Sequence, residues 1–387
     1  MNTKEIAIIG AGIGGLTTAI ALHAKGFTNV TIYERRATAT TMGAGLVLWA
    51  NAVKILEKLN MLAAIEKIGG KLTAMERYTS ENEFLGAIDV STINSGIGAT
   101  SYSVSRADLQ ELLLAKADGL SINIQYNYNL TSIETQQQKA SLLFENALKI
   151  TPDIVIGADG RMQSAARTYV QGNNTPIYQN FVNWIGIVET TKPTFLDHKV
   201  LDYWGVGQRF GLVPINAHKA YWAGGMVLPL NAPEKQGNYK EEMHTMFAFW
   251  SPKIKEVIAL TPTENIKYVE VFDHNPNQQW YKNNVCLIGD AAHAALPTSG
   301  QGACQAIEDA WQLAKCLSIE ECIATAFKSF TALRFNKTTN ITMAGRNLAG
   351  SLFNTDTQYC KQRNEQAKQI DYKNASRGIV QLWGSGL

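Results

Sequence analysis

The segment at residues 289–310, GDAAHAALPTSGQGACQAIEDA, combines small residues with a few groups that can do chemistry. Asp290 and His293 stand near its beginning, and Gly300 and Gly302 precede a run that is typical of a helix. A packed core favours bulky side chains at such positions. The small residues therefore predict that a ligand is bound against bare backbone at the start of this helix.

A second glycine-rich turn, GAGIGG, places Gly10, Gly12 and Gly15 in the pattern G-x-G-x-x-G. The run EIAIIG before it predicts a buried strand, and LTTAIALHAKG after it predicts a helix ending at Gly26. Such glycines close the turn tightly and let backbone N–H groups approach a pyrophosphate. Glu34 ends a second predicted strand, 19 residues after Gly15, where an acid accepts a ribose hydroxyl. This unit predicts a dinucleotide site without deciding between NAD and FAD.

Two further units repeat the strand–turn–helix pattern. PDIVIGADGRMQSAAR, at residues 152–167, predicts an apolar strand that ends in Asp159 and Gly160 before a helix. VCLIGDAAHAALPTSGQGACQAIEDA repeats the pattern with Asp290 at the end of its strand. Upstream of both, SYSVSRADLQELL predicts a strand that leads to a capped helix with Arg106 in its first turn.

With these motifs in this order, from residue 4 to about residue 345, the chain resembles the single-component, FAD-dependent monooxygenases of the para-hydroxybenzoate hydroxylase type. That family carries a GxGxxG, a DG motif and a GD motif, matched here at residues 10–15, 159–160 and 289–290. The resemblance implies an α/β fold with a discontinuous Rossmann-like FAD-binding domain, an antiparallel β-sheet substrate domain and C-terminal helices. It also implies tightly held FAD, with NADH or NADPH as a transient cosubstrate that has no Rossmann domain of its own.

The resemblance implies roles for single residues as well. Glu34 and Arg35 hold the adenosine ribose region, Arg106 reaches the pyrophosphate or ribityl side, and Asp290 binds a ribityl hydroxyl. Asp159 links the FAD region to the visiting nicotinamide cofactor, and the segment GAGLVLWAN, at residues 43–51, lies along the flavin. The full set implied to bind the cofactor is Gly10, Gly12, Gly14, Gly15, Glu34, Arg35, Gly45, Arg106, Leu130, Asp159, Asp290, Pro297, Gly300, Gln301, Gly302 and Ala303.

The helix that begins near Gly302 gives a physical reason for a flavin at this place. Reduced flavin carries negative charge near N1 and the C2 carbonyl, and a helix N-terminus offers unpaired N–H donors there. Such preorganised donors stabilise charge that develops during a reaction. The resemblance implies that reduced FAD and O₂ form a C4a-hydroperoxyflavin that delivers oxygen to an electron-rich substrate. Protein groups then mainly orient the substrate and exclude water.

His293 is interpreted as a structural residue that fixes its loop. The chain has no HExxH or similar ligand spacing, so we expect no metal site. It also lacks the GxSxG elbow of a serine hydrolase. The absence of a CxxC pair argues against the disulfide reductases that bind two dinucleotides.

Residues 176–273 change character, because FVNWIGIVET, LDYWGVGQRFGLVPI and AYWAGGMVLPL predict antiparallel strands. Asn183, Arg209 and Tyr221 fall on successive strands and are the candidate catalytic residues. They are similar to substrate-side residues of the FAD-dependent urate hydroxylases: Arg209 pairs with an anionic substrate, while Asn183 and Tyr221 contact its carbonyl or N–H groups. Six aromatic residues provide either core packing or a face for a planar substrate: Trp184, Tyr203, Trp204, Phe210, Tyr221 and Trp222.

The predicted reaction is hydroxylation of a small, planar, electron-rich molecule, with urate or a related purine as the first choice. A hydroxybenzoate or salicylate hydroxylase and a tetracycline-type monooxygenase stay open, because RFGLVPI occurs widely in the family. A flavin reductase or oxidase that inserts no oxygen is another alternative. A non-catalytic FAD-binding protein is the alternative from a different class.

The composition of the 387 residues is that of a globular protein, 45% hydrophobic and 18% charged, and the length predicts two domains. We assign residues 1–75, 98–175 and 274–345 to the FAD-binding domain. Residues 76–97 and 176–273 form the substrate domain, and residues 346–387 form a helical tail that covers the FAD-binding domain or makes a dimer contact. Arg334, Lys337 and Arg346 are expected on a solvated helix face.

Several features bound the setting of the protein. A net charge of +2 predicts no strong attraction to nucleic acid or to a membrane. Five cysteines without a CxxC pair predict reduced thiols in the cytoplasm. The first strand begins almost at once, which leaves no room for a signal peptide, and no apolar run reaches the roughly 18 residues of a membrane span. We therefore expect a cytoplasmic monomer or homodimer.

Overall fold

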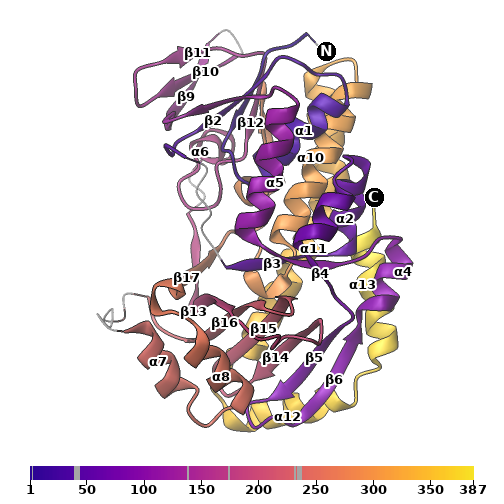
Figure 1. The fold of residues 1–387 in the computed structure, drawn as a ribbon. Coiled ribbons are helices and arrows are strands. Elements are labelled where there is room, and N and C mark those ends of the chain that lie inside the picture. The colour runs from indigo at the N-terminus through magenta and orange to yellow at the C-terminus, as the bar shows by residue number, and fades with distance from the viewer. Residues whose placement is uncertain (2, 39–43, 137–138, 173–174, 231, 233–237) are drawn as a thin grey trace.

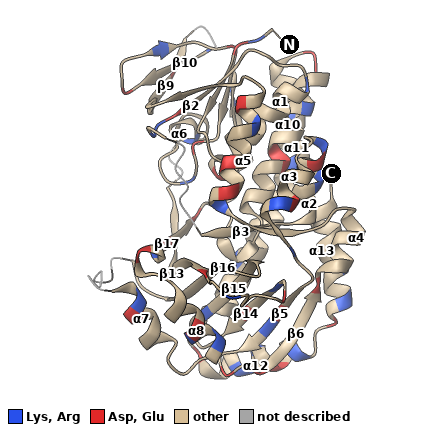
Figure 2. Ribbon diagram, viewed as in Figure 1, with Lys and Arg blue, Asp and Glu red and all other residues tan. Residues whose placement is uncertain are grey.

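The computed structural model describes residues 1–387 except 2, 39–43, 137–138, 173–174, 231 and 233–237. Two principal sheets lie at opposite ends of the folded molecule, and long helices run between them (Figure 1). Figure 2 shows basic and acidic residues spread over both ends, in keeping with the small net charge of +2. Within the described residues, no helix combines the length and the apolar character that a membrane span needs.

The first sheet has six strands in the order β18-β19-β12-β1-β2-β8. Its neighbours are parallel except for the pair β18 and β19 at one edge. All four residues of β1 are buried, as expected for a parallel strand that is covered on both faces. This arrangement confirms the Rossmann-like fold predicted from the sequence. The strands are β1 (Ile6–Ile9), β2 (Val30–Glu34), β8 (Asn123–Tyr126), β12 (Ile154–Gly157), β18 (Tyr281–Lys282) and β19 (Val285–Leu287).

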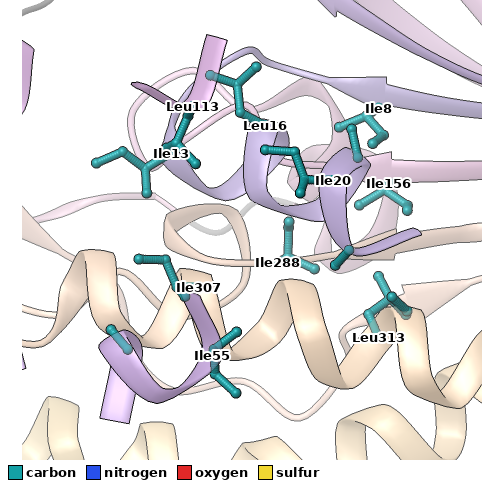
Figure 3. Close-up of a cluster of buried hydrophobic side chains, with 14 of the residues drawn as sticks. Ile8, Ile13, Leu16, Ile20, Ile55, Leu113, Ile156, Ile288, Ile307 and Leu313 are labelled. Carbon is teal, nitrogen blue, oxygen red and sulfur yellow. The ribbon is translucent and has the colours of Figure 1, made fainter. Parts of the chain in front are cut away.

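Three helices cover this sheet on one side: α1 (Ile13–Ala24), α5 (Arg106–Gly119) and α10 (Gly302–Ile319). The close-up in Figure 3 shows Leu16 of α1 beside Leu113 of α5, with Ile307 and Leu313 of α10 in the same apolar cluster. Each buried side chain of this size contributes about 1.5–3 kcal/mol relative to an exposed one. Helix α2 (Ala50–Lys58) packs on the other side of α10 and adds Ile55 to the same core.

The second large sheet has seven strands in the order β17-β13-β16-β15-β14-β5-β6. It is antiparallel except where β14 pairs with β5, so the predicted antiparallel sheet is confirmed. Helices α7 (Tyr239–Met246) and α8 (Pro252–Leu260) pack on one face through an apolar cluster. The strands are β5 (Ala74–Thr79), β6 (Phe84–Asp89), β13 (Ile177–Glu189), β14 (Lys199–Trp204), β15 (Gln208–Asn216), β16 (Lys219–Val227) and β17 (Lys267–Asp273).

Smaller elements connect these layers. One three-stranded sheet has the order β11-β10-β9 and another the order β3-β7-β4. Strand β3 contacts the large antiparallel sheet through Gly45, and its neighbour β7 also contacts β15. The bounds are β3 (Gly45–Leu48), β4 (Gly70–Lys71), β7 (Tyr102–Ser105), β9 (Leu130–Gln136), β10 (Lys139–Phe144), β11 (Lys149–Ile150), α3 (Leu62–Ile68), α4 (Val90–Ile97), α6 (Ala165–Gln171), α9 (Asp290–His293), η1 (Thr263–Asn265) and η2 (Pro297–Ser299).

The C-terminal part is helical, as predicted, but its helices join both ends of the molecule. Helix α11 (Ile323–Leu352) packs along α10. Helix α12 (Thr357–Lys368) contacts β6 of the antiparallel sheet, and α13 (Tyr372–Gly384) contacts both β6 and α4 (Figure 1). The ring of Trp383 in α13 lies 4.9 Å from the ring of Trp49, which precedes α2. The helices therefore brace the two sheets against each other.

A buried charge cluster joins α10 to α11. Arg334 of α11 donates from Nε to Asp309 Oδ1 at 2.7 Å and from Nη1 to Glu308 Oε2. Lys337 Nζ lies 2.7 Å from the same Glu308 oxygen and donates to the backbone carbonyls of Trp383 and Ser385. Arg334 is 2% exposed and Lys337 is 6% exposed. We refer to Glu308, Asp309, Arg334 and Lys337 as the α10–α11 charge cluster.

This cluster shows that the predicted solvated helix face was wrong. Arg334 and Lys337 are buried because α10 supplies two carboxylates, and Trp383 of α13 and the following Ser385 supply carbonyl acceptors. Arg346, the third residue of that prediction, donates to the buried Asp273 at 2.6 Å and 2.9 Å. A stripe of basic residues on a helix can therefore be internal when acidic partners face it.

Replacing Arg334 by methionine tests how much the charge cluster contributes to the stability of the fold. The variant leaves two buried carboxylates short of a cation, so we expect it to lose about 3–5 kcal/mol of unfolding free energy. Urea unfolding monitored by circular dichroism measures this change. Lys328→Met, on an exposed position of the same helix, is the matched control and should change stability by less than about 0.5 kcal/mol. Equal stability of the two variants would contradict the prediction.

Candidate flavin and substrate site

The turn between β1 and α1 leaves space beside bare backbone. Gly10 has a φ of +105°, and a Cβ on Gly15 would lie 1.9 Å from the Gly10 carbonyl oxygen, so neither position tolerates a side chain. A Cβ on Gly12 would meet no atom within 4 Å, and Gly12 precedes α1 without any side-chain cap. A Cβ on Gly14 would instead touch Ala306 of α10. The helix N-terminus thus offers open N–H donors for a diphosphate.

Glu34 closes this turn from the end of β2. Its Oε2 accepts a hydrogen bond from the Ala11 backbone N–H at 2.8 Å, and its Oε1 accepts one from the Arg36 N–H at 3.0 Å. The carboxylate therefore lies at the glycine turn, where the sequence predicts a ribose contact. Arg35, the next residue, and Leu130 of β9 line a cavity of about 430 Å³ that extends to Ser164 and Arg167.

The DG motif caps a helix. Asp159 accepts hydrogen bonds from Ser164 Oγ at 2.5 Å and from the Ala166 N–H at 3.1 Å, at the start of α6. Burial raises the pKa of Asp159, and these hydrogen bonds oppose the rise. Arg167, which the sequence analysis did not select, donates to the carbonyls of Gly160 and Asp290 and so ties the DG motif to the GD motif. The predicted link between Asp159 and a nicotinamide cofactor stays a prediction.

Asp290 and Arg106 share the next part of the site. Asp290 begins α9 with a side chain that is 39% exposed, and Arg161 Nη1 lies 3.7 Å from its carboxylate. Arg106 begins α5 and has an exposed side chain, yet surrounding protein desolvates it and lowers its pKa, which the charge of Asp290 opposes. A side chain that is both exposed and desolvated is typical of a cleft. Arg36 and Arg161 act on the same guanidinium, so the cleft is positive and suits a diphosphate.

The N-terminus of α10 is open as well. Gly300 has a φ of +62°, and its carbonyl accepts a hydrogen bond from Trp49 Nε1 at 3.0 Å. A Cβ on Gly302, the first helical residue, would have only Asp290 Oδ1 within 4 Å. Within the described part of the chain, the N–H groups of Gly302 and Ala303 have no protein acceptor. The preceding loop consists of η2, which begins at Pro297, followed by Gly300 and Gln301.

Buried hydrogen bonds hold this helix from behind. Asn51 of α2 donates to Gln301 Oε1 at 2.9 Å and to Glu308 Oε1 at 2.6 Å. Gln301 and Glu308 are almost fully buried. The α10–α11 charge cluster therefore reaches, through Asn51, the residue that precedes the helix. Asn51 ends the segment at residues 43–51 and Glu308 lies within that at residues 289–310, but no motif in the sequence indicates that they bind each other.

His293 has the structural place that the sequence analysis gave it. Its Nε2 lies 2.5 Å from Asp309 Oδ2, which also accepts the Gly289 N–H at 2.8 Å. The pair binds the GD turn to α10. Burial of Asp309 acts to raise its pKa, but the charges of His293 and Arg334 outweigh this effect and lower it to about 2.

The candidate catalytic residues share one face of the antiparallel sheet. Asn183 of β13 and Arg209 of β15 are both paired with Gly225 of β16, and Tyr221 lies four residues before Gly225 on that strand. Because strand side chains alternate, all three point to the same side. A Cβ on Gly45 of β3 would lie 2.2 Å from the Tyr221 ring, so Tyr221 lies directly against the segment predicted to run along the flavin.

Charge and burial differ along this face. Burial raises the pKa of Tyr221, and the positive charge of Arg209 opposes the rise. Arg209 is half-buried and donates from Nε to Asp202 Oδ1 at 2.6 Å. The Asn183 Oδ1 atom lies over Gly225, 2.3 Å from the position of a Cβ there. Asp202 was not selected from the sequence, since a single aspartate in LDYW carries no motif.

The six aromatic residues divide between the two faces of the sheet. Trp184, Tyr203, Phe210 and Trp222 belong to the apolar cluster under α7 and α8, with Phe210 and Trp222 stacked at 5.3 Å. Core packing is therefore the correct interpretation for these four. Trp204 and Tyr221 lie on the opposite face, together with the candidate catalytic residues.

Comparisons with known proteins agree with this geometry. Residues 3–321 match the protein family described as FAD binding domain. The chain is 29% identical over 383 residues to an FAD-dependent urate hydroxylase of Mycolicibacterium vanbaalenii, covering 97% of this chain and 95% of that one. It is 29% identical to an aurachin C monooxygenase/isomerase of Stigmatella aurantiaca over 86% and 85% of the two chains. The crystal structure of Klebsiella pneumoniae HpxO complexed with FAD and uric acid superposes with a TM-score of 0.90 at 27% identity, covering 100% and 98%.

Acid unfolding tests the role of Asp309. Its pKa in the folded protein, about 2, lies below the ordinary value near 3.9, so its stabilising contribution is complete above about pH 4 and is lost as the pH falls through about 2. We expect Asp309→Asn to be less stable than the wild type at pH 6, by on the order of 2 kcal/mol, with a gap that closes towards pH 2. Urea unfolding between pH 6 and pH 2 measures the gap. Glu321→Gln, on the surface, should follow the wild type, and a gap independent of pH would refute the assignment.

Replacing Asp290 by alanine tests the cofactor cleft. If the carboxylate binds a ribityl hydroxyl, we expect the Kd for FAD to rise at least about tenfold, because a hydrogen bond to a charged group is lost. Fluorescence titration of the apoprotein with FAD measures the Kd. Asp118→Ala, at the exposed end of α5, should bind FAD as the wild type does. Unchanged affinity in Asp290→Ala would remove this residue from the cofactor site.

Proposed function

Because the chain belongs to the FAD binding domain family, we propose that it is an FAD-dependent monooxygenase that uses NADH or NADPH and O₂ to hydroxylate urate or a related purine. One observation carries the substrate assignment: Arg209, Tyr221 and Asn183 share a sheet face whose Tyr221 ring lies against Gly45. An arginine and two neutral hydrogen-bonding groups suit a planar, anionic molecule with carbonyl and N–H edges.

The residues of the cofactor cleft fit FAD. Gly12 and Gly302 leave open space beside two uncapped helix N-termini, and Arg106 stands in a positive cleft next to Asp290. In our proposal, α1 and Arg106 bind the diphosphate, Asp290 binds the ribityl chain, and α10 faces the flavin ring. Bound FAD, reduced by NADH or NADPH, supplies the activation of O₂. The chain itself binds and orients the two reactants and excludes water.

The side chains of the sheet face have separate roles. Arg209 binds the negative edge of the substrate, since a guanidinium offers directed N–H donors. A tyrosine is ordinarily protonated at neutral pH and burial raises the pKa of Tyr221 further, so its hydroxyl donates a hydrogen bond instead of removing a proton. Asn183 offers one donor and one acceptor group to the opposite edge. The open N–H groups of Gly302 and Ala303 would stabilise negative charge on a flavin bound beside them.

The cellular location of the protein, its oligomeric state and its domain boundaries are proposed from the sequence. We propose a cytoplasmic protein with reduced cysteines, a monomer or homodimer, and an FAD-binding domain at residues 1–75, 98–175 and 274–345. In support, none of the cysteines is in a disulfide, and four of the five are buried. The parallel sheet is assembled from those same three segments of the chain.

A substrate screen tests the proposal. The purified holoprotein should be yellow, and urate should stimulate NADH or NADPH oxidation with little H₂O₂ release. Arg209→Ala should raise the KM for urate at least about tenfold with unchanged FAD content, because a charge-assisted contact is lost. Lys267→Ala, at an exposed position of the same sheet, is the control and should behave as the wild type.

Three outcomes would contradict the proposal in different ways. Coupled oxidation with 4-hydroxybenzoate or salicylate and none with urate would assign the aromatic hydroxylase alternative. Oxidation that releases only H₂O₂ with every compound would indicate an oxidase or reductase. Tight FAD binding without any NADH or NADPH oxidation would indicate a non-catalytic FAD-binding protein.

A further inference from the structure

We propose that Asp202 is a positioning residue that fixes the Arg209 guanidinium for substrate binding. This inference rests on the proposed function, because it concerns the same sheet face. Asp202 is 3% exposed, and both of its carboxylate oxygens accept hydrogen bonds. Its Oδ1 accepts from Arg209 Nε at 2.6 Å, and its Oδ2 accepts from Trp204 Nε1 at 2.9 Å. A buried carboxylate with two donors is rigidly held.

Strand register places the pair. Asp202 of β14 is paired with Gly211 of β15, and Trp204 is paired with Arg209. The Nη2 atom of Arg209 lies 4.0 Å from the position that a Cβ on Gly211 would take. The arginine side chain therefore extends over Gly211, and its Nε comes beside the carboxylate. The Arg209 side chain thus runs along β15 towards Val213, which is paired with Tyr221 of β16.

The carboxylate is itself held in place. The Trp204 ring has two guanidinium groups within cation–π distance: the Cζ of Arg77 at 5.3 Å and that of Arg363 at 5.4 Å. Arg363 donates in turn to the carbonyls of Gly205 and Ser351. Trp204 therefore cannot turn freely, and Asp202 accepts from an indole whose position the C-terminal helices define.

The bond at Nε decides which atoms of Arg209 are left for a ligand. Its Nη1 and Nη2 groups have no hydrogen-bond acceptor among the residues that the structure describes. These two groups form the terminal edge of the guanidinium, which binds carboxylate-like or carbonyl edges in one plane. Asp202 also offsets the charge of Arg209. The site thus binds through directed hydrogen bonds more than through net charge, which favours a planar substrate over small inorganic anions.

Asp202→Asn tests this role. Both partners of the carboxylate are donors, so an asparagine can accept from one of them only and turns its NH₂ group towards the other. We expect the KM for urate to rise at least about tenfold and the ratio of product to NADH consumed to fall, with unchanged FAD content. Trp204→Phe removes the second donor and keeps the Arg209 pair, so its KM should rise clearly less than that of Asp202→Asn.

The double variant Asp202→Asn with Trp204→Phe separates positioning from a general structural effect. With the indole donor gone, the amide oxygen can face Arg209 Nε, so we expect the KM and the product ratio to return to within about threefold of Trp204→Phe. A purely structural role predicts instead that the double variant is at least as impaired as Asp202→Asn. That result, or a wild-type KM in Asp202→Asn, would overturn the inference.

A structural readout keeps this test separate from the proposed function. If the wild type shows no response to urate, the substrate assignment fails, and crystal structures of the wild type and of Asp202→Ala decide the role of Asp202. A guanidinium of Arg209 that leaves its position over Gly211 in Asp202→Ala supports the inference. An unmoved Arg209 overturns it, whatever the substrate is.

Discussion

The ion pair between Arg334 and the adjacent carboxylates of Glu308 and Asp309 is the contact on which the rest of the structure depends. Helix α10 starts at Gly302 with no side-chain cap, so the N–H groups at its start make no contribution to holding the helix in place. The helix is fixed instead mainly at its second turn, where Glu308 and Asp309 bind Arg334, Lys337, His293 and Asn51. A helix end can stay open to a ligand when the charges behind it are satisfied.

The antiparallel sheet shows the same combination, in which some polar atoms of a group are bound within the protein and others are left open to a ligand. Arg209 uses Nε for Asp202 and leaves its terminal groups open, as α10 uses its middle and leaves its first N–H groups open. In both places a glycine lies beside the open groups, Gly211 beside the guanidinium and Gly302 at the helix start. Polar atoms that bind a ligand must be unpaired in its absence and still well oriented, which requires a buried partner behind them.

Local sequence predicted the parts of the fold that depend on local physics. The glycine pattern at residues 10–15 predicted the β1 turn because only glycine fits a φ of +105° or an approach of 1.9 Å. Alternation predicted the strands that carry Asn183, Arg209 and Tyr221. Arg334 and Lys337 were misjudged because their partners lie about 25 to 29 positions earlier on another helix. Asp202 was missed because its contact with Arg209 depends on the register of β14 and β15, and no pattern within either strand defines that register.

The contact of Trp383 with Trp49 has a consequence for the order of events in biosynthesis. Trp49 holds the Gly300 carbonyl, Trp383 packs on Trp49, and Lys337 binds the carbonyls of Trp383 and Ser385. A nascent chain that has left the ribosome only as far as residue 320 contains every strand of the parallel sheet and all three glycine-rich motifs. It has Asn51 and His293 but lacks Arg334, Lys337 and Trp383, so the contacts that fix α10 are complete only after residue 385 has emerged.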